Sequence, residues 1–322
     1  MKDENPGAFG GVFGSIRGKL LLVILVLFVL VIGTLMYFSY NGQLQIIADN
    51  EQEIYNIIES TVQNSMENEL DQAETSILSV VTNPEVSAAF AARDRERLSM
   101  LLGPVYAAIK EKGVAQFHFH TPPATSFLRL QSPEKYGDDL SGFRKTVVAC
   151  NNEQRLVKGL EEGKDGFGFR VVVPVTHLGR HVGSAEYGFD FGQHFLQHLN
   201  ESVPGTYFIY RLPDQGSVAW DNAGTDKLAG TVETDPFPTD SKALAAMVSN
   251  GKMQHYLTQD KLNSVVLVPF TDYEGSLKGY IKVLMSRAET VNKLNGIRNQ
   301  ALLIIVVSLI IVSALTIFMV RY

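Results

Sequence analysis

The sequence predicts an α+β fold in which a long N-terminal helix precedes two tandem antiparallel-sheet modules, flanked by two transmembrane helices. Three observations predict this arrangement. Each end of the chain carries an uncharged apolar run of membrane-spanning length. An amphipathic helical pattern follows the first run. Two later blocks of strand-like sequence share a short sequence segment, which indicates an internal repeat.

Composition excludes several classes of protein. The chain has 322 residues, of which 45% are hydrophobic and 19% are charged, and this excludes an intrinsically disordered chain. A formal net charge of −6 excludes a general nucleic-acid binder, which needs a basic face. The single cysteine, Cys150, excludes an intrachain disulfide and has no evident role. Phosphate-binding loops and nucleophile elbows are absent from the sequence, so we expect neither an enzyme nor a bound cofactor.

The two apolar runs cover residues 20–38 and 301–320, and each is long enough to cross a bilayer as a helix. A cleaved signal peptide is the alternative for the first run, but the run is too long and bulky aromatic residues follow it. Positively charged residues flank both runs on their outer ends (Lys2, Arg17, Lys19 and Arg321). Such flanks stay in the cytoplasm. We therefore expect a two-pass protein of the bacterial inner membrane, with a cytoplasmic tail at 1–19, a cytoplasmic C-terminus, and residues 39–300 in the periplasm.

A helical stalk is expected over residues 42–112. Apolar residues recur there at steps of three and four: Ile54, Ile58, Val62, Met66, Leu70, Ala73, Ile77 and Val81. Pro84 ends this first helix, because the residue before a proline avoids helical geometry. A second helix is predicted at 94–112. A long helix with so narrow a stripe commonly pairs with a copy of itself, so we expect a homodimer.

The first sheet module is expected at 113–203, with helices on one side of its sheet. Alternating and apolar patterns predict a helix at 141–151 and strands at 114–120, 126–131, 167–176 and 181–191. The second module is expected at 204–288, with a helix at 240–250 and strands at 206–212, 217–221, 253–259, 264–271 and 278–286. The text VPVT at 173–176 matches VPFT at 268–271, which lies 269 − 174 = 95 residues later. A glycine, Gly183 or Gly279, follows each proline at a similar distance, which favours two copies of one module.

Several stretches of the first module carry specific text: FHTPPATSFLR at 119–129, PEKYGDDL at 133–140, GLE at 159–161, GFGFR at 166–170 and GSAEYG at 183–188. In these sequence segments the chain resembles the Cache family of extracytoplasmic sensor domains. It is most similar to the double-Cache sensors that precede the output domains of chemoreceptors, histidine kinases and diguanylate cyclases. The resemblance implies a PAS-like antiparallel sheet in each module and a small ligand held by the membrane-distal one, residues 113–203.

The candidate ligand-binding residues come from this module: His118, His120, Phe127, Arg129, Asp139, Arg144, Arg170 and Glu186. Strand alternation places both histidines on one face. Two imidazoles at that spacing can chelate a metal, line a pocket or face solvent, and we expect a pocket and no metal. Each of the three arginines can bind a carboxylate through two parallel hydrogen bonds. The alternative is that they form surface ion pairs with acids such as Asp138, Asp139 and Glu161.

Glu186 lies on the polar face of its strand, and a buried carboxylate must be paired with an arginine or with a cationic group of the ligand. These charges suit an amino acid, an amine or a carboxylate as the ligand. Asp190, His194 and His198 are spaced at four residues, as in zinc-binding helices. The glutamate of that motif is missing, so we expect an ordinary amphipathic helix there.

The predicted function is ligand sensing by a bacterial transmembrane receptor, a methyl-accepting chemotaxis protein, which signals through its second membrane helix. A histidine kinase or a diguanylate cyclase could carry the same sensor region. An inner-membrane polysaccharide co-polymerase also has two terminal spans and long exported helices. Such proteins have a proline-rich segment near the second span, whereas the last proline here is Pro269. The sequence ends two residues after the second span, so we expect output domains beyond Tyr322 or a signalling partner.

Overall fold

The computed structural model describes residues 16–163, 166–213 and 226–321. It divides into two compact units: Met1–Ile54 with Arg287–Tyr322, and Tyr55–Ser286. The predicted strand at 217–221 and most of the predicted N-terminal tail lie outside the described residues.

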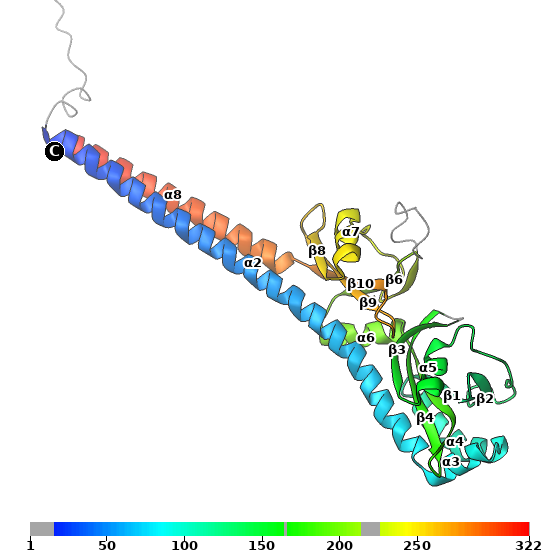
Figure 1. Ribbon diagram of the computed structural model, residues 1–322. Helices are drawn as coiled ribbons and strands as arrows, with labels where there is room; N and C mark the ends of the chain where they lie inside the picture. Colours follow the sequence, from blue (N-terminus) through cyan, green and yellow to red (C-terminus); the bar gives the residue numbers. More distant parts are fainter. Residues whose placement is uncertain (1–15, 164–165, 214–225, 322) are drawn as a thin grey trace, which may run out of the picture. The chain divides into compact units, whose positions relative to one another are not determined.

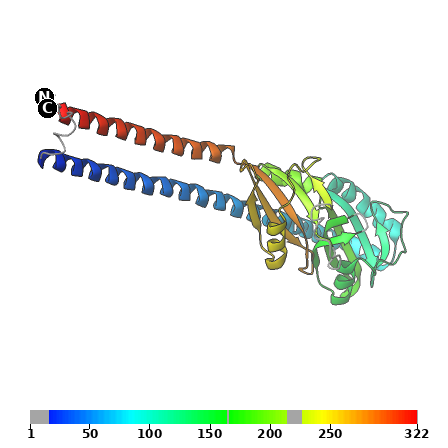
Figure 2. The same cartoon turned by 90° about the horizontal axis from the view of Figure 1, so that it is seen from above.

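The first unit consists of the start of helix α2 (Ile16–Val81) and helix α8 (Ala288–Arg321), which Figure 2 shows as two long ribbons. Both helices are long and apolar enough to cross a membrane, and both predicted spans lie within them. Residues 16–19 of the predicted tail already belong to α2. Arg287 and Glu51 join the two helices through a bidentate ion pair, with Nε to Oε1 at 2.6 Å and Nη2 to Oε2 at 2.9 Å.

The second unit begins with the rest of α2, whose apolar stripe is covered by the chain's own sheets. Ile58 and Val62 are buried in one core cluster, and Ala73 and Ile77 are buried in another. The stripe therefore provides no evidence for a homodimer, because these apolar residues of α2 are buried against other elements of the same chain. Helices α3 (Pro84–Ala91) and α4 (Arg95–Lys110) follow, and the side chain of Asp94 caps α4 by accepting from the Arg97 amide.

The first sheet has five antiparallel strands in the order β2-β1-β5-β4-β3. They are β1 (Val114–Thr121), β2 (Thr125–Arg129), β3 (Val157–Gly163), β4 (Gly166–His177) and β5 (Arg180–Asp190). Figure 1 labels β1, β2, β3 and β4 of this sheet, drawn in green. Helices α2, α3 and α4 cover one face of the sheet. Helix α5 (Lys145–Glu153) covers the other face, so the expectation of helices on one side only is wrong. The sequence also failed to predict β3, because its two glycines and its charged residues weaken the strand pattern.

The second sheet repeats this topology in the order β7-β6-β10-β9-β8. Its elements are β6 (Thr206–Arg211), β7 (Lys227–Gly230), α7 (Ser241–Asn250), β8 (Gln254–Leu257), β9 (Asn263–Thr271) and β10 (Leu277–Ser286). Helix α6 (Gln193–Ser202) precedes it. Helix α7 covers the face that corresponds to the α5 side of the first sheet. The structure thus confirms the predicted α+β fold with two like sheets in tandem.

The glycines of the predicted repeat have the same role in both sheets. A Cβ atom on Gly183 would lie 2.3 Å from the carbonyl oxygen of His120 on the paired strand. A Cβ atom on Gly279 would lie 2.2 Å from the carbonyl oxygen of Tyr210, again on the paired strand. Both positions need glycine because the neighbouring backbone approaches so closely.

Candidate functional site

A cavity of about 590 Å³ lies on the α5 side of the first sheet. Four residues singled out in the sequence line it: His118 on β1, Arg129 at the end of β2, Arg144 at the start of α5, and Arg170 on β4. The sequence reasoning missed other lining residues, among them Gln116, Gln131, Lys135, Tyr136, Asp138 and Phe143. Gln116 could have been found, because strand alternation places it on the same face as the two histidines.

The other four candidates do not line this cavity. His120 and Glu186 lie behind the lining side chains and are fully buried. Phe127 packs on the opposite face of the sheet, with its ring centroid 5.2 Å from that of Phe90. Asp139 is exposed, and its carboxylate accepts hydrogen bonds from the backbone amide (2.9 Å) and hydroxyl (3.0 Å) of Ser141.

Arg144 is the centre of a buried ion-pair network. Its Nε donates to Oε2 of Glu161 at 2.8 Å, and its Nη2 donates to Oε1 of Glu186. Glu161 also accepts from the backbone amide of Thr146 at 2.8 Å, so it satisfies a free amide at the start of α5. Burial acts to raise the pKa of Glu186, but the guanidinium groups of Arg144 and Arg170 outweigh it and the pKa is lowered. Glu186 therefore stays ionised although it is shielded from water.

Arg170 extends this network across the sheet. Its Nη1 donates to Oε1 of Gln116 at 2.6 Å and lies 3.5 Å from Oε1 of Glu186. The guanidinium group occupies the space that a side chain on β5 would need, since a Cβ atom on Gly188 would lie 2.0 Å from Nη1. Gly188 thus leaves the space in which Arg170 approaches Glu186.

Arg129 and Asp138 form a bidentate ion pair at the rim of the cavity. Nη1 donates to Oδ1 at 2.8 Å and Nη2 donates to Oδ2 at 2.7 Å. The sequence suggested Asp138 only as one of several surface partners for the arginines. The hydrogen bonds from Arg129 lower the pKa of Asp138 from 3.8 to about 2.

Replacing Arg129 by glutamine is expected to return the pKa of Asp138 toward 3.8, which a carboxyl NMR titration would detect. Because the folded pKa lies below the unfolded one, the ion pair stabilises the fold above about pH 4 and this contribution is lost as pH falls through about 2. Asp139 is the matched control, because Ser141 and not Arg129 lowers its pKa. An unchanged titration of Asp138 in the variant would contradict this assignment.

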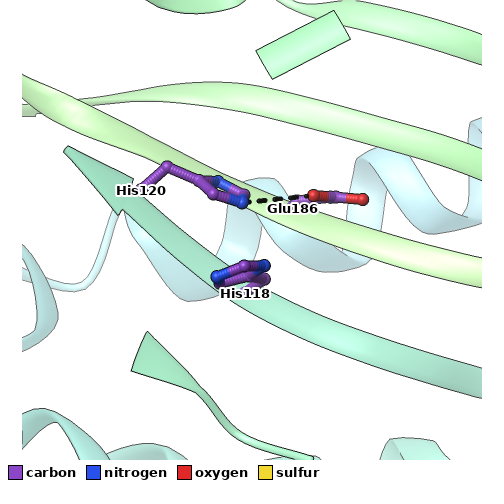
Figure 3. A group of neighbouring side chains, drawn as sticks. All are labelled: His118, His120 and Glu186. Atoms are coloured by element: carbon purple, nitrogen blue, oxygen red, sulfur yellow. Dashed lines mark ion pairs between the residues drawn. The ribbon is translucent and has the colours of Figure 1, made fainter. Parts of the chain in front are cut away.

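His118 and His120 lie side by side on β1, with Glu186 on the adjacent β5 (Figure 3). The ring centroids of the two histidines are 3.9 Å apart. His118 bonds through Nε2 to the hydroxyl of Ser126 at 2.8 Å, and Nε2 of His120 lies 3.4 Å from Oε2 of Glu186. Burial lowers the pKa of both histidines well below 6.5, with positive charges such as Arg144 adding to the effect, so both rings are neutral at neutral pH.

Asp190, His194 and His198 were the other possible metal ligands in the sequence. His194 and His198 lie one turn apart on α6 with ring centroids 4.4 Å apart, and His198 approaches Glu69 at 3.4 Å. Within the described ranges they form no three-ligand group, and α6 buries an apolar face as expected of an amphipathic helix. Cys150 is a buried residue of α5, and burial raises the pKa of its thiol to about 12, which makes it unreactive.

The second sheet has different side chains at the positions that correspond to this site. Lys282 on β10 takes the place of Glu186 on β5, since each pairs with the middle of both neighbouring strands. Its ammonium group is fully buried and lies 2.6 Å from Oδ2 of Asp235, which also accepts from the hydroxyl of Tyr210 at 2.7 Å. Tyr210 and Tyr280 stack beside it with centroids 5.2 Å apart. The chain's own side chains therefore occupy this position in the second module.

Comparison with solved structures identifies sensory domains. The sensory domain of the Campylobacter jejuni chemoreceptor Tlp3 with isoleucine bound is similar over 79% of this chain and 98% of that chain, at 14% identity and a TM-score of 0.49. The periplasmic domain of Vibrio cholerae LuxQ is similar over 71% of this chain and 96% of that chain, at 11% identity and a TM-score of 0.46. No curated protein sequence matches the chain.

A family model described as "Double sensory domain of two-component sensor kinase" matches residues 49–290. The match confirms the resemblance to double-Cache sensors that the first module's text suggested, and it overturns the alternative of a polysaccharide co-polymerase. Members of this family are ligand-binding and not catalytic modules. The chain therefore belongs to the double-Cache sensory domains of transmembrane receptors and sensor kinases.

Proposed function

We propose that residues 113–203 are the membrane-distal sensing module of a bacterial chemoreceptor and that their cavity binds a small solute carrying a carboxylate group. The observation that carries this proposal is the excess of cationic side chains on one cavity, where Arg129, Lys135, Arg144 and Arg170 face two acids, Glu134 and Asp138. Arg144 uses Nε and Nη2 for its buried glutamates, and its Nη1 makes no hydrogen bond to the residues that the structure describes. A guanidinium edge of this kind suits a carboxylate.

The signal would act through α5, because Arg144 begins this helix and ties it to β3 and β5 through Glu161 and Glu186. A solute that binds Arg144 more tightly in one packing of α5 on the sheet than in another shifts the equilibrium between the two. We propose that the shift reaches the second membrane helix, that both termini are cytoplasmic, and that residues 39–300 are periplasmic. The second module carries Lys282 and two tyrosines at the equivalent position, which favours the first module as the one that binds the solute.

The input region of a sensor kinase is the second candidate, because the matching family model is described by that class of protein. The coding sequence after Tyr322 distinguishes the two candidates. A long signalling helix with methylation sites would support the chemoreceptor, and a histidine-kinase domain would support the alternative.

The proposal predicts that carboxylates, including amino acids, raise the melting temperature of the full chain in lipid nanodiscs, whereas simple amines do not. At a concentration 100 times its Kd, a bound solute adds about 2.7 kcal/mol to the stability of the folded state.

Arg129→Gln is expected to weaken binding by about tenfold or more, since it removes one charged hydrogen-bonding group from the cavity.

Arg155→Gln is the matched control, because the Arg155–Glu153 ion pair is exposed and lies outside the cavity. Stabilisation by amines alone, or equal stabilisation by carboxylates in the wild type and the Arg129→Gln variant, would rule out this site and ligand class.

A further inference from the structure

Three buried polar atoms beside the cavity lack a hydrogen-bond partner among the described residues. Both ring nitrogens of His120 and the Oε2 atom of Glu186 make no hydrogen bond to the described part of the chain. Both side chains are fully buried. Buried polar groups in folded proteins nearly always have a hydrogen-bond partner. Three neighbouring atoms without one indicate a bound ion or water that completes the site. Two of the atoms, Nε2 of His120 and Oε2 of Glu186, point toward one another (Figure 3).

Their geometry matches that of a metal site. Ligand atoms bound to zinc at about 2.0–2.2 Å in a tetrahedron lie about 3.4 Å from one another. Nε2 of His120 and Oε2 of Glu186 are 3.4 Å apart. His118 completes a set in which one possible ligand atom of each residue lies within 4.8 Å of the other two. Two imidazoles and one carboxylate are ligands that Zn²⁺ and related ions prefer.

The surrounding residues hold these ligands as the outer partners of metal sites do. When Nε2–H of His118 donates to the hydroxyl of Ser126 at 2.8 Å, Nδ1 keeps its lone pair for an ion. Arg144 holds Oε1 of Glu186 and leaves Oε2 directed at His120. The cationic charge of Arg144 and Arg170 near the ion is offset by two buried carboxylates, Glu161 and Glu186.

We propose that His118, His120 and Glu186 bind one divalent transition-metal ion of the Zn²⁺ class beside the sensing cavity. His118 lines that cavity, so the ion has an entry path and an open coordination position on the cavity side. The ion is a second ligand of the module, and its binding does not depend on which organic solute the cavity accepts.

The test uses the full chain in detergent micelles, with no polyhistidine tag, after removal of metals by a chelator and with no organic solute added. Titration with Zn²⁺ against a chromophoric chelator is expected to give one bound ion per chain. Loss of an outer partner of a metal site weakens metal binding by about 10–100-fold, so the loss of a ligand in His118→Ala or His120→Ala is expected to cost at least about 100-fold. The double variant His194→Ala/His198→Ala is the control, because it removes two histidines outside the site, and it is expected to bind as the wild type does.

Electron paramagnetic resonance of the Cu²⁺-loaded chain gives a second readout that does not depend on affinity. The spectrum is expected to show coupling to two imidazole nitrogens, and to one in either single histidine variant, with circular dichroism confirming that each variant is folded. Zinc bound at less than one ion per chain, or a two-nitrogen signal that survives His118→Ala/His120→Ala, would overturn the proposal. Because only the metal is added, this outcome would leave the proposed binding of a carboxylate solute untouched.

Discussion

Replacing Arg144 by methionine is expected to lower the free energy of unfolding by about 3–5 kcal/mol, because removing one partner leaves buried charges uncompensated. Glu161 would lose its cation and Glu186 would keep only Arg170, 3.5 Å away, although both carboxylates are almost completely shielded from water. The loss would be measured as a lower midpoint of chemical denaturation, followed by circular dichroism.

Arg155→Met is the matched control for Arg144→Met. The ion pair between Arg155 and Glu153 is exposed, so its loss is expected to cost less than about 1 kcal/mol. Adding Glu186→Gln to Arg144→Met should recover part of the stability, since it removes one of the two buried carboxylates that no longer pair with Arg144. Equal midpoints for Arg144→Met and the control would show that the buried network contributes nothing beyond a surface pair.

Replacing Lys282 by methionine is expected to destabilise the protein by about 3 kcal/mol or more, because Asp235 would lose a fully buried partner. The neutral double variant Lys282→Met/Asp235→Asn should be more stable than the single one, since no unpaired charge remains. Denaturation midpoints of the two variants would provide this comparison.

Lys278→Met is the control within the same strand, because the ammonium group of Lys278 is partly exposed and lies 3.4 Å from Asp272. It is expected to cost less than about 1 kcal/mol. If Lys282→Met were no more destabilising than Lys278→Met, the buried lysine would not be a structural pair. Solute binding by the first module should persist in folded Lys282→Met protein, because this pair belongs to the second sheet.

The two strands that the sequence failed to predict show the limit of local patterns. β3 and β7 are edge strands that contain glycine and charged residues, so their alternation is weak. They form because β4 and β6 offer free backbone groups to pair with. The long strands β4, β9 and β10 were predictable because apolar and β-branched residues dominate them, and β5 was predictable because its polar and apolar residues alternate.

The position of Glu186 shows a second limit. Strand alternation correctly placed it on the polar face with His118 and His120 across β1. As a candidate ligand-binding residue, it was expected to face the ligand. The structure instead places it behind Arg144 with no exposed surface, so Glu186→Ala would disturb the fold itself.

Local sequence was enough to predict the two apolar spans, the long amphipathic helix, the tandem strand pattern and the sensor family, because each depends on the periodicity or the residues of a short segment. The folded arrangement was needed to learn which charges pair, which candidates line the cavity, and that the stripe of α2 packs against the chain's own sheets. The reason is distance along the chain. Arg144 meets partners 17 and 42 residues away, and no local pattern encodes which of several carboxylates the folded sheet will bring to one guanidinium group.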